Sequence, residues 1–349
     1  MKRMIFIKRL AWGTVSVLAI IVAIMGFIIY NKIYTTNIVS RNDEKEFLYI
    51  PTGSTIEDLI SILKKKNLLI NENSFRWTAK QMKYDTKLKP GKYQLKLKMN
   101  NKELVLLLRS GRQVPVSVIF NNIRSKEQLA QRIGEQIEAK PQSILNLIND
   151  IDYTKRLGFT TENILALFIP NTYEFYWNTS ADKFLKKMKK EYDKYWTPQR
   201  LSLAKKINYN IIEISVLASI VQMESNKEDE KPIIAGVYIN RLKKEWKLEA
   251  DPTLVFALGD YSISRVLKIY KEIDSPYNTY MYNGLPPGPI CLPTIASLNA
   301  VLKYTPHTYM YFCAKDDFSG YHAFATSYDQ HLVNARKFQK ALDRRGIRS

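Results

Sequence analysis

The sequence predicts an α+β protein with an N-terminal transmembrane helix, a small α+β module and a larger mixed α/β domain. Three observations lead to this prediction. Residues 10–30 contain no charged side chain, residues 44–122 mix short strand and helix patterns, and residues 123–349 are mostly helical with a few aromatic-rich extended segments. The 349-residue chain is long enough for two domains beyond the apolar stretch.

We expect residues 10–30 to cross a membrane as one helix, because about 20 apolar residues span a bilayer. Lys2, Arg3, Lys8 and Arg9 precede the stretch, and the positive-inside rule then keeps residues 1–9 in the cytoplasm. A cleaved signal peptide is the alternative, but no small-x-small cleavage site follows. The sequence therefore predicts a single-pass protein of the plasma (inner) membrane, with a polar stalk over 31–43 and an extracytoplasmic or periplasmic body.

The chain is strongly basic, with 53 Lys and Arg against 33 Asp and Glu and a formal net charge of +20. Such a charge attracts polyanions. Outside the membrane these are lipid headgroups and cell-wall polymers, so nucleic acid is not an expected partner. The basic residues are spread along the chain, and we expect most of them to form solvated faces. Cys291 and Cys313 form no CxxC motif and the chain has only three His, so a structural zinc site is not expected, while a disulfide stays open.

The segment 44–122 has the pattern of a small α+β module. Thr55-x-x-Asp58 is a helix-start signal, and Asn67 suits the left-handed residue that ends this helix. The expected elements are strand 47–50, helix 55–66, a helix capped by Asn73 and ending near Lys83, strand 93–97, helix 102–109 and strand 114–120.

Helices dominate the segment 123–349. The expected helices are 126–137 after the N-cap Ser125, 142–149, 181–195, 198–206, 211–225, 232–246, a short helix after Asp251-Pro252, and 329–342. Residues 165–175 are expected to be extended, residues 275–293 form a loop rich in Pro and Gly, and 309–313 and 321–324 are expected strands.

The helix over 211–225 carries Glu224 at the end of an apolar face. The residues expected on its side are Val216, Leu217, Ile220 and Val221, and the opposite side holds Ser215, Ser219 and Gln222. A carboxyl held against hydrocarbon resists ionisation, so its pKa rises toward the range of a general acid. The alternative is a Glu at a helix end that reaches solvent. Glu213 lies near the helix N-terminus, where an acid favours the helix dipole, and Glu228, Asp229 and Glu230 are expected to be a solvated helix start.

Several ordered motifs resemble one family. They are Leu217-Ala218-Ser219-Ile220-Val221-x-x-Glu224-Ser225, Gly236-Val237-Tyr238-Ile239-Asn240-Arg241-Leu242, Leu248-x-x-Asp251-Pro252-Thr253, Ser275-Pro276-Tyr277-Asn278-Thr279-Tyr280, Gly284-Leu285-Pro286-Pro287-Gly288-Pro289-Ile290 and Tyr321-His322-x-Phe324. In this order and spacing the chain resembles the MltG-type (YceG-like) endolytic murein transglycosylases over nearly its whole length. It departs from the family pattern at Leu165-Ala166 and at Cys291-Leu292-Pro293-Thr294. The segment 44–122 (a predicted LysM-like module) resembles LysM modules more loosely, through Gly53-Ser54-Thr55, and either glycan binding or a spacer role is open for it.

The family resemblance implies a lyase, an endolytic peptidoglycan lytic transglycosylase. Such an enzyme cuts the MurNAc-β-1,4-GlcNAc bond within nascent glycan strands, forms a 1,6-anhydroMurNAc end and so terminates strand elongation. Glu224 would act first as general acid and then as base, and no metal or organic cofactor is implied. Peptidoglycan glycan strands are the implied substrate, and peptidoglycan synthases are implied partners.

The resemblance also implies substrate contacts for a second set of residues: Asn240, Arg241, Asp251, Tyr277, Asn278, Thr279, Tyr280 and His322. Each has a structural alternative. Asn240 and Arg241 could form surface contacts, Asp251 could be a helix cap or Asx turn, and the Tyr277–Tyr280 loop could be packed by its tyrosines. His322 and His331 could serve packing or hydrogen bonding. A rival function is a non-catalytic, membrane-anchored wall-binding or scaffold protein.

Overall fold

The computed structural model describes residues 2–40, 46–263 and 266–346. The chain forms two compact units, one made of Met1–Val116 with Glu174–Thr179 and the other of Ser117–Tyr173 with Ser180–Ser349. Each unit mixes helices with short antiparallel strand pairs, in agreement with the predicted α+β class. The predicted border between stalk and module at residue 43 lies outside the described residues.

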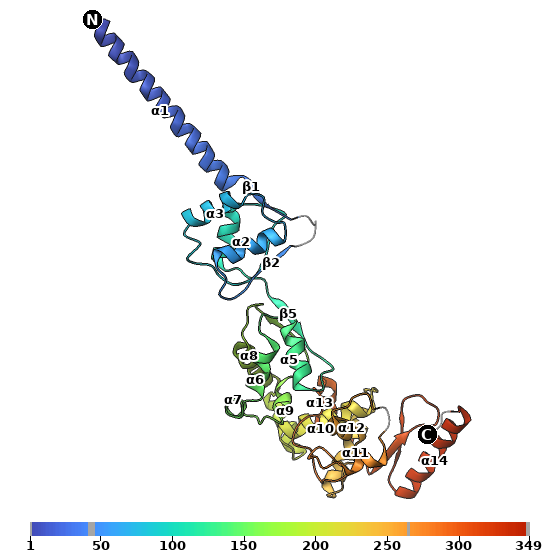
Figure 1. The fold of residues 1–349 in the computed structure, drawn as a ribbon. Coiled ribbons are helices and arrows are strands. Elements are labelled where there is room, and N and C mark those ends of the chain that lie inside the picture. The colour runs from blue at the N-terminus through green and yellow to red at the C-terminus, as the bar shows by residue number, and fades with distance from the viewer. Residues whose placement is uncertain (1, 41–45, 264–265, 347–349) are drawn as a thin grey trace. The chain divides into compact units, whose positions relative to one another are not determined.

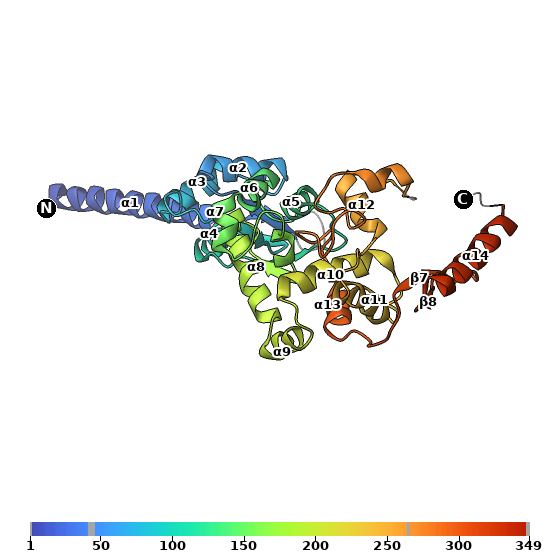
Figure 2. The ribbon, with the colours of Figure 1, turned by 90° about the horizontal axis from the view of Figure 1, so that it is seen from below.

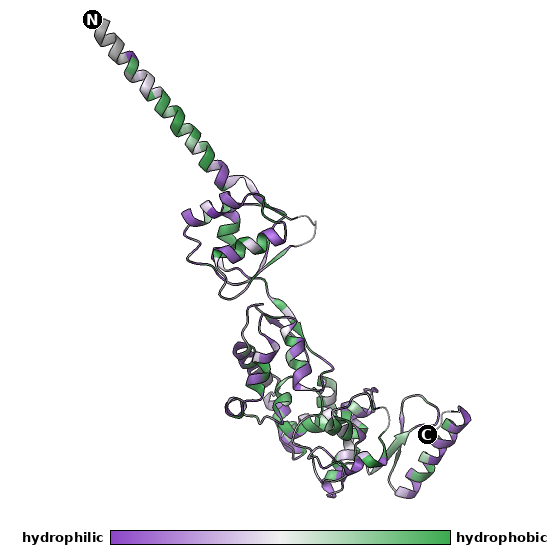
Figure 3. Cartoon of the chain, viewed as in Figure 1, coloured by the Kyte–Doolittle hydropathy of each residue, from purple (hydrophilic) through white to green (hydrophobic). Residues whose placement is uncertain are grey.

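The first unit begins with one long helix, α1 (Lys2–Tyr34), which extends away from the small module (Figures 1 and 2). Within it Trp12–Tyr34 is long and apolar enough to cross a membrane, with an 18-residue window of mean hydropathy 2.4. Figure 3 shows this hydrophobic stretch and the hydrophilic turn that follows it.

The small module follows α1 almost immediately. Its elements are β1 (Thr36–Val39), β2 (Phe47–Ile50), α2 (Ile56–Lys65), α3 (Glu72–Gln81), β3 (Gly91–Gln94), β4 (Lys98–Asn100) and α4 (Asn101–Ser110). β2 pairs with β3 and β1 pairs with β4, both antiparallel. Ile38, Leu48, Leu63, Phe75 and Leu104 belong to one buried core.

Two local predictions for the small module are corrected by the structure. Residues 36–39, expected in a polar stalk, form β1, because Ile38 is fully buried in the core and pairing with β4 satisfies the backbone. The cap of α3 is Asn71 and not Asn73, since the Asn71 side chain accepts from the Ser74 N–H. The capping box of Thr55 and Asp58 and the left-handed Asn67 (φ 55°) are confirmed.

The end of α1 is attached to the small module by side chains of two helices. The Lys32 carbonyl accepts hydrogen bonds from Asn101 Nδ2 (2.8 Å) and Thr78 Oγ1 (3.2 Å). The Lys102 ammonium lies 5.0 Å from the centre of the Tyr34 ring. Carbonyls in the last turn of a helix have no partner within the helix, and here the module supplies donors to one of them.

The chain leaves the small module through β5 (Val116–Ile119), which pairs with β6 (Thr172–Phe175). The second unit contains α5 (Lys126–Gly134), α6 (Pro141–Ile148), α7 (Ile151–Arg156), a 3₁₀ turn (Ile164–Leu167), α8 (Ala181–Tyr195), α9 (Pro198–Lys206), α10 (Ile211–Glu224), α11 (Lys231–Lys243), α12 (Asp251–Leu258), a 3₁₀ turn (Lys268–Glu272), α13 (Ile295–Leu302), β7 (Tyr311–Ala314), β8 (His322–Ala325) and α14 (Tyr328–Arg344). The 3₁₀ turn at 164–167 replaces part of the extended segment expected over 165–175, because its four residues are all buried.

The core of the second unit is a helical layer around α10, with α11 and α13 beside it in both views (Figures 1 and 2). α10 was expected to be amphipathic, but Ile214–Val221 are buried on every side. Ser219 is fully buried, and its hydroxyl accepts from the Ile290 N–H at 3.0 Å. Gln222 accepts from the Thr294 N–H at 2.7 Å. The polar side of α10 therefore binds backbone and does not face solvent.

Candidate active site

The position of Glu224 follows from the two ends of α10. Asn210 and Glu213 form a capping box at the start of the helix, which confirms that Glu213 serves the helix N-terminus. Ser225 is extended and ends the helix directly after Glu224. The last residue of a buried helix therefore brings a carboxyl group to the edge of the core.

Glu224 lies in a cavity of about 590 Å³. The cavity is lined mostly by apolar side chains together with a few charged ones: Arg124, Met223, Glu224, Asp251, Pro252, Val255, Phe256, Tyr261, Ile263, Val266 and Ile290. Burial raises the pKa of Glu224 from 4.5 to about 7, while the Tyr238 hydroxyl lowers this pKa, the charge of Asp251 raises it and that of Arg241 lowers it. Glu224 is thus a carboxyl group that holds its proton near neutral pH, as expected of a general acid.

Tyr238 holds the Glu224 carboxyl in place. Its hydroxyl donates to Glu224 Oε1 at 2.6 Å, and the tyrosine itself is fully buried on α11. Tyr238 belongs to the Gly236–Leu242 motif, whose sequence does not indicate a role for it. A buried tyrosine needs a hydrogen-bond partner, and this requirement could have indicated the contact. Close packing positions α11, because a Cβ on Gly236 would lie 2.5 Å from His307 Nε2.

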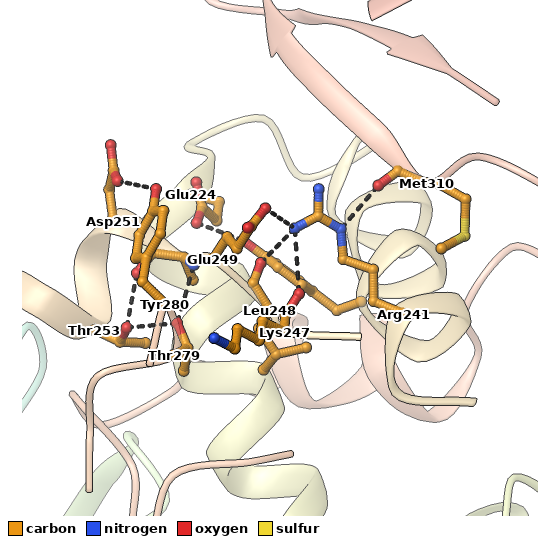
Figure 4. Close-up of polar contacts among 12 residues, drawn as sticks. Glu224, Arg241, Lys247, Leu248, Glu249, Asp251, Thr253, Thr279, Tyr280 and Met310 are labelled. Carbon is orange, nitrogen blue, oxygen red and sulfur yellow. Dashed lines mark hydrogen bonds and ion pairs between the residues drawn. The ribbon is translucent and has the colours of Figure 1, made fainter. Parts of the chain in front are cut away.

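Asp251 is the second carboxylate of the cavity. It is the first residue of α12, and Ala250 occupies the cap position, so the alternative that Asp251 caps the helix is wrong. Its Oδ1 accepts a hydrogen bond from the Tyr280 hydroxyl at 2.5 Å. The structure therefore places Asp251 and Tyr280 near Glu224 (Figure 4), and their contact with substrate stays a prediction.

The remaining residues of the Tyr277–Tyr280 loop have structural roles. Asn278 is fully buried and donates through Nδ2 to the carbonyls of Lys271 and Ile273. Thr279 is 2% exposed, and its hydroxyl accepts from the Ala250 N–H. Their polar atoms are used within the protein, so the structure does not support substrate contact by either residue.

Tyr277 contacts a residue of the cavity wall. Its ring packs on Phe256, which lines the cavity, with the two ring centres 4.6 Å apart. Tyr277 itself is not among the lining residues.

Asn240 and Arg241 also bind the protein's own backbone. Asn240 Nδ2 donates to the carbonyls of His307 (2.8 Å) and Tyr309 (3.0 Å). Arg241 is buried, and it donates to the carbonyls of Met310 (2.8 Å) and Leu248 (2.7 Å), as Figure 4 shows. The structure does not support substrate contact by either residue, because Asn240 Nδ2 and Arg241 Nε and Nη1 donate to the protein's own backbone and neither residue lines the cavity.

His322 lies outside the cavity and pairs with a buried carboxylate. Its Nδ1 is 2.8 Å from Glu230 Oε2, and its backbone N–H donates to Glu230 Oε1 at 2.6 Å. Glu230 is 3% exposed and also accepts from the Ser225 hydroxyl at 3.2 Å. The expectation that Glu230 is solvated is therefore wrong, since it connects the residue after Glu224 to the β7–β8 hairpin. His331 stacks on Tyr311, with ring centres 5.3 Å apart.

Arg124 is the functional candidate that sequence analysis missed. It follows β5 and lines the same cavity as Glu224 and Asp251. Nothing in its local sequence marks it, because the residues around it in space are far away along the chain. Cys291 and Cys313 are both free thiols, so the pairing left open above is not formed. Within the described residues no group of three or more His, Cys, Asp or Glu is placed to hold a metal ion.

The chain matches the model of one known protein family. The profile of the YceG-like family matches residues 48–337, which include all the cavity-lining residues and the small module except β1 and the first residue of β2. The chain belongs to the YceG-like family. This confirms the resemblance seen in the ordered motifs from Leu217 to Phe324.

Individual relatives of this YceG-like chain are similar over most of its length. An endolytic murein transglycosylase of Bacillus subtilis is 28% identical, with 90% of each chain covered. An endolytic murein transglycosylase of Streptococcus pneumoniae is 25% identical over 82% of this chain, which spans only 57% of that relative's length. A crystal structure of a yceG-like protein from Listeria monocytogenes superposes with a TM-score of 0.56 at 29% identity, covering 84% of this chain and 99% of the other.

Proposed function

We propose that this YceG-like protein is an endolytic peptidoglycan lytic transglycosylase that cleaves the MurNAc-β-1,4-GlcNAc bond within glycan strands. The observation that carries the proposal is a carboxyl group with a pKa of about 7, held by Tyr238 in a cavity of about 590 Å³. Relatives named endolytic murein transglycosylases support the same reaction class.

The proposed reaction needs one acid that becomes a base. The hydrogen bond from Tyr238 occupies Glu224 Oε1 and leaves Oε2 to deliver the proton to the glycosidic oxygen. As the C1–O bond breaks, the C6 hydroxyl of the same MurNAc attacks C1, and the Glu224 carboxylate takes the hydroxyl proton. No water is consumed, and a 1,6-anhydro ring forms. Attack within one sugar gives the hydroxyl a high effective concentration.

Tyr238 and Asp251 stabilise the charges that form during the proposed reaction. The Tyr238 hydroxyl stabilises the Glu224 carboxylate after proton transfer, since hydrogen bonds to charged acceptors are the stronger ones. Asp251, held by Tyr280, presents a negative charge toward the cavity. We assign it the stabilisation of positive charge that develops at C1, as carboxylates do in glycoside cleavage.

The apolar helix gives the proposed enzyme a place of action. With the N-terminal Lys and Arg residues on the cytoplasmic side, α1 would anchor the catalytic unit on the extracytoplasmic side of the plasma membrane. Cutting would then be confined to strands close to the membrane, where they are made, and would terminate their elongation. Peptidoglycan synthases are the corresponding partners.

The test uses the full-length chain in detergent with purified uncrosslinked glycan strands. Mass spectrometry of the products should show anhydro-ended fragments from the wild type and none from Glu224→Gln. Asp152→Asn, which changes an exposed carboxylate on α7, is the control and should keep full activity. Reducing ends in place of anhydro ends would show a hydrolase, with Asp251 as the candidate for its second carboxylate. Binding without any cleavage by the wild type would support the rival scaffold function.

A further inference from the structure

We propose that Arg124 binds a carboxylate of the substrate strand, an inference that rests on the proposed function. Peptidoglycan carries carboxylates in two places, on the stem peptide and, where the peptide has been removed, on the lactyl group of muramic acid. A guanidinium recognises either one by paired hydrogen bonds.

Arg124 lines the same cavity as the carboxyl groups of Glu224 and Asp251 but forms an ion pair with neither of them. Across residues 2–40, 46–263 and 266–346, no ion pair includes Arg124, although its side chain is half-buried in the cavity wall. A cation partly withdrawn from water gains most from an anion that enters the cavity with the ligand.

The structure also holds Arg124 in position. Its backbone N–H donates to Gln128 Oε1 at 2.9 Å, and its carbonyl accepts from the Tyr261 hydroxyl at 3.3 Å. The guanidinium carbon lies 5.4 Å from the centre of the Tyr261 ring. Such stacking restrains the side chain while its N–H groups remain available, so less freedom is lost when a ligand binds.

Arg124 is placed to bind and not to tune the acid. The arginine whose charge lowers the pKa of Glu224 is Arg241, which lies outside the cavity wall. The cavity therefore contains the acid Glu224 and, as a separate group, the cation Arg124. This is the arrangement needed to bind a charged substituent of the sugar while the acid acts on the scissile bond.

A polar hollow lies beside the Arg124 backbone, because Gln128, which accepts from the Arg124 N–H, is one of its lining residues. It has a volume of about 440 Å³ and is lined by Asn121, Asn122, Ile123, Gln128, Gln131, Arg132 and Glu135. Side-chain amides pair with peptide N–H and C=O groups. Arg124 does not line the hollow itself, but Ile123 and Gln128, which are close to it along the chain, do. We therefore expect the carboxylate to come from a stem peptide and not from the lactyl group.

The test measures kcat and KM of the full-length enzyme on three strands: peptide-bearing, peptide-free with lactyl carboxylates, and peptide-bearing with carboxylates converted to methylamides. Arg124→Gln should raise KM about 10-fold or more on the carboxylate-bearing strands that use the site, since a charged hydrogen bond is lost. It should leave KM on the methylamide strands unchanged. Arg124→Lys should recover part of the affinity, and Lys190→Gln, an exposed charge on α8, should change nothing.

The outcomes separate the proposals. A KM effect confined to peptide-bearing strands identifies the peptide carboxylate, and one confined to peptide-free strands identifies the lactyl carboxylate. An equal effect on methylamide strands, or none on any strand, overturns the assignment of Arg124. The wild type alone gives a second measurement, because its KM should rise on methylamide strands whether or not the variants fold. Absence of anhydro products from the wild type would instead contradict the proposed function.

Discussion

Replacing Tyr238 with Phe removes the hydroxyl that donates to Glu224 Oε1 at 2.6 Å. It leaves the fully buried aromatic ring in place, so little else in the packing changes. This hydrogen bond lowers the pKa of Glu224, which is about 7 in the intact site. A hydrogen bond to a charged group contributes about 1.5–3 kcal/mol, and one pKa unit corresponds to about 1.4 kcal/mol. The Glu224 pKa should therefore rise by about 1–2 units in Tyr238→Phe.

The sign of the effect on activity follows from the role of the acid. Glu224 must be protonated for the first step, so kcat/KM falls as pH rises through its pKa. In Tyr238→Phe this fall should move about 1–2 pH units upward, while kcat decreases because the carboxylate has lost its donor. The assay uses mass spectrometry to measure the initial rate of anhydro-product formation at several pH values between 5 and 10.

A matched control exists on the surface. The Tyr282 hydroxyl also donates to a carboxylate, Asp274, at 2.6 Å, but the ring is 45% exposed. Tyr282→Phe should leave the pH profile where it is in the wild type. If the fall in kcat/KM stays at the wild-type pH in Tyr238→Phe, or moves downward, the assignment of Glu224 as the titrating acid is refuted.

Three further predictions follow from the same structure. The pKa of Glu224 is raised from 4.5 to about 7, so its contribution to the free energy of unfolding is full below pH 4.5 and is lost as the pH rises through 7. Glu224→Gln should therefore stabilise the fold by up to roughly 3 kcal/mol at pH 8 and by little at pH 4.5. Denaturant unfolding of both proteins at the two pH values measures this difference. Arg241→Lys should lower the free energy of unfolding by about 2–4 kcal/mol, because an ammonium cannot reach both the Leu248 and Met310 carbonyls, and a normal melting temperature would contradict this. Cys291 is buried with its pKa raised to about 12, so iodoacetamide at pH 8 should modify it only after unfolding, and mass spectrometry of the native protein would detect any exception.

Local signals in the sequence were sufficient for several elements. α8 and α9 begin and end where predicted, because Ser180 caps the first and Pro198 opens the second. The apolar run before Glu224 likewise predicted both the helix and its terminal acid. These features depend on neighbours within one or two turns, and such neighbours can be read along the chain.

Features that depend on distant segments were missed or misplaced. Glu230 stands in a run of charges that predicts solvent exposure, yet it is buried, with the backbone N–H and ring Nδ1 of the distant His322 at hydrogen-bonding distance from its carboxylate. Residues 36–39 contain three β-branched side chains but only four residues, and their strand is established by pairing with β4, which lies about 60 residues further along the chain. Arg241 and Asn278 were identified as polar motif residues, but the direction of each side chain is decided by tertiary packing.

The junction between α1 and the small module has a mechanical consequence. The Lys32 carbonyl is bound by Asn101 and Thr78, and β1 starts at Thr36. As a result, no flexible linker separates α1 from the small module. A single helix in a bilayer commonly leans by about 20°, and here that lean would be transmitted to the whole module. Bilayer thickness, which sets the tilt of such a helix, would then affect the orientation of the small module. A flexible insert after Tyr34 would make the module's orientation independent of the helix tilt.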